Sequence, residues 1–162
     1  MSDQVETVAE LYRHAQQTQL EGDFESAKAL YLEILKLEPE HADSLHCLGN
    51  IDARQGRFDD AERLIKKAIS LEPLKASFIN SLGNLLKVND RPEEAAAMYE
   101  QAVRLRPDFA VAQNNLGELL MRQGDLEESV EAFLKALEID PDFAGAYANL
   151  GRALNNLGRL DD

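Results

Sequence analysis

Small and apolar residues recur along this chain at one constant interval, which gives a 34-residue repeat. Counted from Ala42, positions 1, 4, 7, 8 and 11 of each repeat share one helical face, which predicts a first helix from about Ala42 to Gln55. A small residue at position 20, a large apolar residue at 24 and usually alanine at 27 predict a second helix. Proline at position 32 ends it, because its ring clashes with a continuing helix. Leucine and glycine hold positions 7 and 8 in Leu48-Gly49, Leu82-Gly83, Leu116-Gly117 and Leu150-Gly151.

The position-8 glycine is unusual, because glycine inside a helix costs about 1 kcal/mol relative to alanine. Its repetition predicts close approach by a neighbouring helix. Gly56, Asn89-Asp90 and Gly124 are expected to end the first helices, since these residue types tolerate the left-handed conformation. Asp23 and Asp125 are expected to cap the second helices that follow.

With the Leu-Gly pair, the position-20 alanine, the position-24 aromatic residue and the position-32 proline, the chain resembles the tetratricopeptide repeat (TPR) family. The resemblance implies an all-α, right-handed superhelical solenoid of antiparallel helix pairs, with about nine helices. Residues 1–7 form a lead-in to an array of about four and a half repeats. The fifth repeat ends where its second helix would begin, so we expect the chain to be part of a longer protein. The repeats run 8–41, 42–75, 76–109, 110–143 and 144–162.

The overall charge and cysteine content limit the partners. The formal net charge is −13, which argues against a nucleic-acid or anionic-membrane partner. No apolar run approaches the roughly 18 residues of a membrane span, and no secretory signal is visible. The single cysteine, Cys47, forms no internal disulfide, and a cytoplasmic location is predicted.

Nothing in the sequence indicates catalysis. His41, His46 and Cys47 lack a further ligand at a structural-zinc spacing, so no metal site is predicted. Acid pairs such as Glu93-Glu94 fall in the first turn of second helices, where they complement the helix dipole. No phosphate loop, nucleophile elbow or dinucleotide motif is present. We expect no cofactor and no catalytic residue.

By the family resemblance, positions 2, 5, 6, 9, 12 and 13 of the first helices line a concave groove. Five basic residues, counting Arg13, outnumber the two acids Asp43 and Glu118, a surplus of three positive charges. Asparagine amides both donate and accept hydrogen bonds, so a row of them suits a peptide main chain. A merely solvated polar face is the other interpretation. The predicted groove residues are Asn50, Asn80, Asn84, Asn114, Asn115, Asn149, Arg54, Lys87, Arg122 and Arg152.

Two specialised members of the family offer partial parallels. O-linked N-acetylglucosamine transferases carry asparagine at position 6, which Asn115 and Asn149 match and Arg13, Cys47 and Ser81 do not. Co-chaperones clamp a C-terminal carboxylate with asparagine and basic residues. Asn84 and Asn115 fit that clamp, but Asn80, Gly145 and Asn149 stand where basic residues are required. The resemblance therefore argues against the co-chaperone clamp.

Three functions follow as hypotheses. The first is a non-catalytic scaffold that binds a protein or extended peptide, with an acidic segment favoured by the basic surplus of the groove. The second is the substrate-recruiting region of a larger enzyme, such as a glycosyltransferase or methyltransferase. The third is self-association through the last helix, where we expect Tyr147, Leu150 and Leu154 to be exposed without a partner helix.

Overall fold

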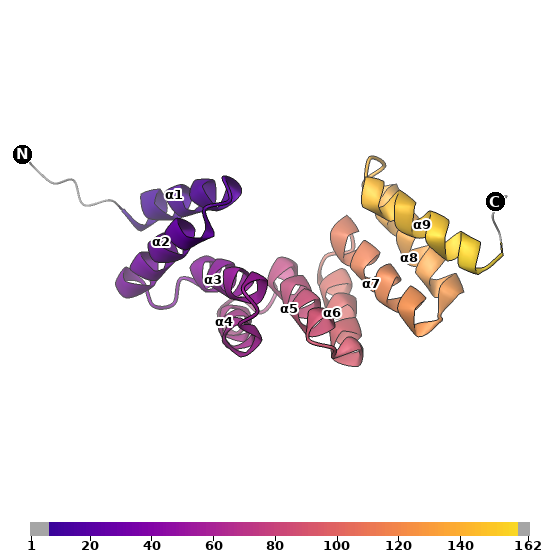
Figure 1. Cartoon of the computed structure of the whole chain (residues 1–162), viewed down its shortest axis with the longest axis horizontal. Helices are drawn as coiled ribbons and strands as arrows, with labels where there is room; N and C mark the ends of the chain where they lie inside the picture. Colours follow the sequence, from indigo (N-terminus) through magenta and orange to yellow (C-terminus); the bar gives the residue numbers. More distant parts are fainter. Residues whose placement is uncertain (1–6, 159–162) are drawn as a thin grey trace, which may run out of the picture. The chain divides into compact units, whose positions relative to one another are not determined.

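The computed structural model describes residues 7–158, and every regular element among them is an α-helix, as predicted (Figure 1). Nearly all of the predicted lead-in and the last four residues of the fifth repeat lie outside this range. Two compact units divide the chain between Leu74 and Lys75. The first contains α1 (Val8–Leu20), α2 (Phe24–Leu37), α3 (Ala42–Arg54) and α4 (Phe58–Leu71). The second contains α5 (Ala76–Val88), α6 (Pro92–Leu105), α7 (Ala110–Gln123), α8 (Leu126–Ile139) and α9 (Ala144–Asn156).

Within each unit, consecutive helices pack as pairs. In the first unit α1 packs on α2 and α3 on α4, and α2 also contacts α3. In the second unit α5 packs on α6 and α7 on α8, with further contacts from α6 to α7 and from α8 to α9. Each first helix and the second helix that follows it therefore form one helix–turn–helix, the unit that the repeat pattern predicts.

Local sequence explains most helix ends. The side chain of Asp23 accepts a hydrogen bond from the Ser26 backbone N–H and caps α2, and Pro92 occupies the first turn of α6. Gly56 and Gly124 take positive φ values of 76° and 95° in the turns. The predicted cap at Asp125 is wrong: Asp125 precedes α8, but its side chain makes no capping hydrogen bond.

Gly83 shows why glycine recurs inside the first helices. A Cβ at this position would lie 2.6 Å from the ring of Tyr99, so only glycine lets the ring pack on the backbone of α5. Ile65 covers Gly49 and Phe133 covers Gly117 in the same way. The predicted close approach is confirmed at these three glycines. Gly151 differs, because nothing lies within 4 Å of the Cβ position there.

Asp52 occupies position 11 of its repeat, where the later repeats have leucine, and its side chain is buried on α3. Lys28 of α2 lies 3.0 Å from its carboxylate, and Arg57 donates to the same oxygen. A buried carboxylate is tolerated when charged donors surround it. The ion pair between Lys28 and Asp52 therefore joins the first repeat to the second.

Candidate functional site

Predicted groove asparagines on α5 and α7 are linked by hydrogen bonds. The Nδ2 atom of Asn115 donates to Oδ1 of Asn80 at 3.0 Å and to Oδ1 of Asn84 at 3.1 Å. The hydroxyl of Tyr99, on α6, donates to the same Asn84 oxygen at 2.8 Å. Both Nδ2 hydrogens of Asn115 are used, and the carbonyl of Asn84 accepts two hydrogen bonds.

The next pair of first helices is linked in the same manner. Asn149 of α9 donates from Nδ2 to Oδ1 of Asn114 on α7 at 2.9 Å, and Arg152 donates to the carbonyl of Asn149. Asn80, Asn114 and Asn149 are buried, whereas Asn84 and Asn115 are half-buried. We call these five residues of α5, α7 and α9 the asparagine surface.

Two of the hydrogen bonds between asparagines of successive repeats join the same two repeat positions. Position 5 of one repeat meets position 6 of the next in Asn80–Asn115 and in Asn114–Asn149. The hydroxyl of Tyr12 and the Sγ atom of Cys47, 3.9 Å apart in the first unit, occupy the same two positions. The periodicity of the first helices predicts the asparagines but not this pairing. The signal that could have found it is the constant spacing between position 5 and position 6 of successive repeats.

The hydrogen bonds determine which polar atoms stay available. Among the described residues, the Nδ2 atoms of Asn80, Asn84 and Asn114 and the Oδ1 atom of Asn115 have no hydrogen-bond partner. They are not sealed from solvent, because the only buried side-chain polar atom of residues 7–158 without a partner is Oγ of Ser44. The asparagine surface therefore offers mostly N–H donors.

The predicted basic residues differ in their surroundings. Lys87 lies 2.8 Å from the Glu118 carboxylate, so this pair is close to neutral. Arg152 binds Asn149, and the guanidinium of Arg54, in the first unit, lies 4.5 Å from the centre of the Phe24 ring. Arg122 is exposed and has no ion-pair partner among residues 7–158. Of the basic residues predicted for the groove, those in the second unit that carry charge available to a ligand are thus Arg122 and Arg152.

Asn50 is the one predicted asparagine that lies outside the asparagine surface, on α3 of the first unit. Its Nδ2 atom lies 3.1 Å from Nε2 of His46, one turn earlier on the same helix. His41, considered with His46 and Cys47 as a metal ligand, uses Nδ1 to accept the Ser44 backbone N–H at 3.2 Å and so caps α3. Its ring also packs on Tyr12, with centroids 5.2 Å apart.

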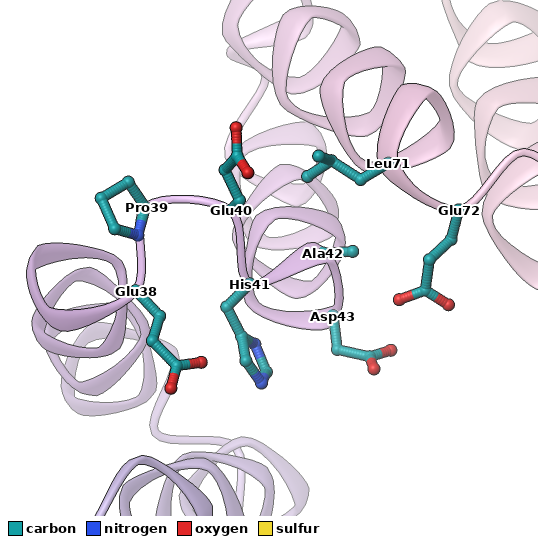
Figure 2. Close-up of a pocket in the computed structure, with 8 residues that line it drawn as sticks. All are labelled: Glu38, Pro39, Glu40, His41, Ala42, Asp43, Leu71 and Glu72. Atoms are coloured by element: carbon teal, nitrogen blue, oxygen red, sulfur yellow. The ribbon is translucent and has the colours of Figure 1, made fainter.

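An open pocket of about 800 Å³ lies in the first unit, beside the α2–α3 connection and the end of α4. In Figure 2 the side chains of Glu38, His41, Asp43 and Glu72 extend to one side of the connection and Glu40 to the other. Four of the lining side chains are carboxylates, so the electrostatic character here is opposite to that predicted for the groove. The lining residues are Glu38, Pro39, Glu40, His41, Ala42, Asp43, Leu71 and Glu72.

Burial affects the ionisation of three tyrosines. Desolvation raises the pKa of Tyr99 above its ordinary value of 10.0, and the nearby Glu118 charge acts in the same direction. Desolvation likewise raises the pKa of Tyr12 and Tyr31, with a further contribution from Cys47. These hydroxyls therefore keep their protons in ordinary buffers and remain hydrogen-bond donors.

Comparison with known proteins agrees with the repeat geometry. Three tetratricopeptide repeat family models match residues 19–76, 80–142 and 132–162. Successive helix pairs fit the same description, and in three of them a large side chain covers the position-8 glycine. The chain belongs to the tetratricopeptide repeat family. Among curated proteins, no sequence matches it at a significant level.

Solved structures with the same fold include three of differing relevance. The crystal structure of MamA is 28% identical, with a TM-score of 0.76, over 91% of this chain and 86% of that one. An O-GlcNAc transferase mutant from Thermobaculum terrenum is 26% identical, with a TM-score of 0.77, over 81% of this chain but 26% of the transferase. YrrB, described as a TPR protein with an unusual peptide-binding site, is 23% identical, with a TM-score of 0.70. The match covers 94% of this chain and 79% of that one, and it supports the fold alone.

No helix within residues 7–158 has the length and hydrophobicity needed to cross a bilayer.

Proposed function

We propose that this chain is a non-catalytic binding scaffold and that the asparagine surface holds the main chain of an extended, acidic peptide segment. The observation that carries the proposal is the set of unpartnered Nδ2 groups on Asn80, Asn84 and Asn114, beside the unpartnered Oδ1 of Asn115. A peptide main chain supplies both complements, since its carbonyls accept and its N–H groups donate. Recognition of this kind depends little on the ligand's side chains.

Charge supports an acidic ligand at this surface. Arg122 and Arg152 are exposed on α7 and α9, and exposed ion pairs contribute about 0.2–1 kcal/mol each. The pocket of the first unit, with its four carboxylates, does not suit such a ligand. We therefore assign the acidic segment to the second unit alone.

The test begins with selection of binding peptides from a random peptide display library, followed by calorimetric titration of a selected peptide. Asn84→Asp is the informative variant, because it keeps an oxygen for Tyr99 and Asn115 and replaces the available N–H donor with an acceptor. A lost hydrogen bond contributes about 0.5–1.5 kcal/mol, and the new oxygen repels the peptide carbonyl. We expect roughly a tenfold or larger loss of affinity, which corresponds to about 1.4 kcal/mol.

Gln101→Glu is the matched control, because it adds the same charge on α6, a helix that carries none of the five asparagines. Equal affinities for Asn84→Asp and Gln101→Glu would contradict the assignment of the binding surface. Alanine at both Asn84 and Asn115 is less informative, since it also removes the bonds between α5 and α7.

A second candidate is a substrate-recruiting region of a larger enzyme. The observation that favours it is the similarity to the O-GlcNAc transferase, of which this chain matches 26%. Sequencing the full transcript decides between the two: a glycosyltransferase or methyltransferase domain in the same reading frame supports recruitment. An open reading frame that encodes repeats alone contradicts it.

A third candidate is self-association through α9. Tyr147 is 55% exposed and Gly151 is uncovered, whereas Leu150 and Leu154, predicted to be exposed, are half-buried. If α9 mediates association, Tyr147→Ser lowers the sedimentation-average mass at high concentration. A wild-type chain that stays monomeric across the concentration series refutes self-association through α9.

We also propose a cytoplasmic location, on the strength of the single cysteine, and cell fractionation tests it.

A further inference from the structure

The hydroxyl of Tyr99 is buried beneath the asparagine surface. The ring fills the space over Gly83, and the side chain is 0% exposed. A buried hydroxyl hydrogen requires an acceptor, because leaving it without one forfeits the hydrogen bond that it makes to water in the unfolded chain. The acceptor that the structure provides is Oδ1 of Asn84, at 2.8 Å.

This one hydrogen bond determines the direction of the others. A side-chain amide that is flipped about its last bond exchanges its oxygen and nitrogen with almost no change of shape. If Asn80, Asn84 and Asn115 were all reversed, each amide–amide contact would still join a donor to an acceptor. In the reversed arrangement Asn84 would direct an N–H at Tyr99, and the buried phenolic hydrogen would lose its acceptor. Only the orientation seen in the structure satisfies all four groups.

We propose that Tyr99 is a positioning residue whose hydroxyl orients the amides of Asn80, Asn84 and Asn115, so that the surface over α5 selects ligand oxygens that accept hydrogen bonds. This rests on the proposed function and specifies its ligand chemistry as carbonyl or carboxylate. Asn80 and Asn84 supply the N–H donors, and Asn115 supplies a neighbouring acceptor. Desolvation raises the pKa of Tyr99, which keeps the orienting hydrogen in place.

Other repeats show that the ring and the hydroxyl have separable roles. Phe133 covers Gly117 with the same ring atoms that Tyr99 places over Gly83, so the packing requires no hydroxyl. Tyr31 of the first unit uses its hydroxyl at the same repeat position to donate to Oε1 of Gln19, at 3.0 Å. A tyrosine at position 24 is thus bonded to a first-helix amide of its own repeat in both cases.

Tyr99→Phe in the ligand-free chain tests the positioning role by NMR of the side-chain amides. In the wild type, the Nδ2 protons of Asn115 are hydrogen-bonded and those of Asn84 exchange rapidly with water. In Tyr99→Phe both orientations become populated, so the Asn115 protons move upfield and the exchange at Asn84 slows. Tyr31→Phe is the matched control and leaves the amides of the second unit unchanged. Unchanged Asn84 and Asn115 resonances in Tyr99→Phe would overturn the proposal.

A rescue separates orientation from packing. Aspartate at position 84 has only acceptor oxygens, so in Asn84→Asp the Asn115 protons stay bonded whether residue 99 is tyrosine or phenylalanine. If adding Tyr99→Phe to Asn84→Asp moves the Asn115 resonances as far as Tyr99→Phe alone does, the effect is one of packing and the proposal fails. Circular dichroism of each variant verifies that the helices remain folded.

Two small probes test the ligand chemistry at matched ionic strength. Sodium acetate offers acceptor oxygens and guanidinium chloride offers donors. We expect acetate to shift the Asn84 Nδ2 resonances of the wild type, with a smaller shift in Tyr99→Phe, and guanidinium to leave them in place. An equal response to both probes would overturn the acceptor preference. If a selected peptide binds wild type and Tyr99→Phe alike, this inference fails while the proposed function stands.

Discussion

At the scale of single residues, Ser44 and Ser129 show opposite uses of a buried hydroxyl. Both side chains are fully buried. Ser129 donates to the backbone carbonyl of Leu126 at 2.7 Å, whereas Oγ of Ser44 has no partner within residues 7–158. The fourth and fifth repeats place Ala112 and Ala146, both fully buried, at the position of Ser44, and the third places a buried phenylalanine there. A methyl group therefore suits this site in the repeat.

We expect Ser44→Ala to raise the free energy of unfolding by about 1 kcal/mol, because it removes a buried hydroxyl whose desolvation no hydrogen bond offsets. Ser129→Ala is the paired comparison and should lower it by about the same amount. Urea denaturation followed by circular dichroism measures both changes. A Ser44→Ala chain less stable than the wild type would show that the hydroxyl has a partner in solution.

The buried tyrosines predict a loss of stability in alkaline solution. Burial raises the folded-state pKa of Tyr12, Tyr31 and Tyr99 above 10.0, so above that pH the folded chain binds more protons than the unfolded chain. By linkage, the stability is fully present below a pH equal to the ordinary tyrosine pKa of 10.0 and falls as the pH rises further. Thermal unfolding as a function of pH tests this, and Tyr99→Phe should weaken the dependence. An unchanged melting temperature in strongly alkaline buffer would contradict it.

The sequence predicts which helix face a residue lies on better than it predicts which side chains that residue bonds to. The place of each asparagine follows from the periodicity of the first helices, but their mutual bonds depend on the distance between successive repeats. The exception at position 11, Asp52, is visible in the sequence, yet its partners come from other elements: Lys28 from α2 and Arg57 from the turn before α4. Helical periodicity relates residues on the same helix, so it does not predict ion pairs between residues of different elements.

At the scale of helices, the position-8 glycines combine a local cost with a packing gain. Glycine weakens a helix by about 1 kcal/mol relative to alanine. At Gly83 that cost permits the contact with Tyr99, whereas at Gly151 nothing occupies the corresponding space. The same residue in the same repeat position therefore has different energetic consequences on α5 and α9.

We expect Gly83→Ala to destabilise the chain and Gly151→Ala to stabilise it. The Cβ at position 83 would lie 2.6 Å from the Tyr99 ring, and overpacking of this kind typically costs about 1–3 kcal/mol. At position 151 only the helix propensity changes, for a gain of up to about 1 kcal/mol. Urea denaturation of the two variants provides the measurement. A destabilising Gly151→Ala would mean that another helix covers this site in solution.

Helix positions are largely predictable because the signals are local. The predicted first helix from Ala42 to about Gln55 is observed as α3, Ala42–Arg54. Asp90 takes a φ of 56° at the Asn-Asp step that the sequence predicts as the end of α5. Capping is less predictable: Asp23 caps α2 and Asp125 does not cap α8, although both follow a turn glycine. Residue type permits a cap, but backbone geometry determines whether the hydrogen bond forms.

At the scale of the whole molecule, the net charge of −13 opposes the approach of an acidic peptide. Screening acts over about 10 Å at roughly 0.1 M salt, so added salt weakens this long-range repulsion. We expect the association rate of a selected acidic peptide to increase with salt. The dissociation rate should increase as well, since salt also screens Arg122 and Arg152. Stopped-flow fluorescence measures both rates, and an association rate that falls with salt would contradict the prediction.

The division into two compact units could not have been predicted from the repeat. The repeat pattern continues without interruption through Leu74 and Lys75, where the units meet in the sequence. The repeat pattern describes the residues that every repeat shares. A boundary between compact units depends instead on how few contacts two particular neighbouring repeats make with each other. The fold of each unit was therefore accessible from sequence, and the extent of each unit was not.

The pairing of position 5 with position 6 of the next repeat restricts how this array could be rearranged in evolution or by design. The α7 helix contributes Asn115 to a pair with the preceding repeat and Asn114 to a pair with the following one. A duplicated or transplanted repeat would meet an unsuitable neighbour, for example Tyr12 opposite Asn115 if the fourth repeat followed the first. Repeats with the same scaffold sequence are thus not interchangeable modules. Their order is part of the information that the chain carries.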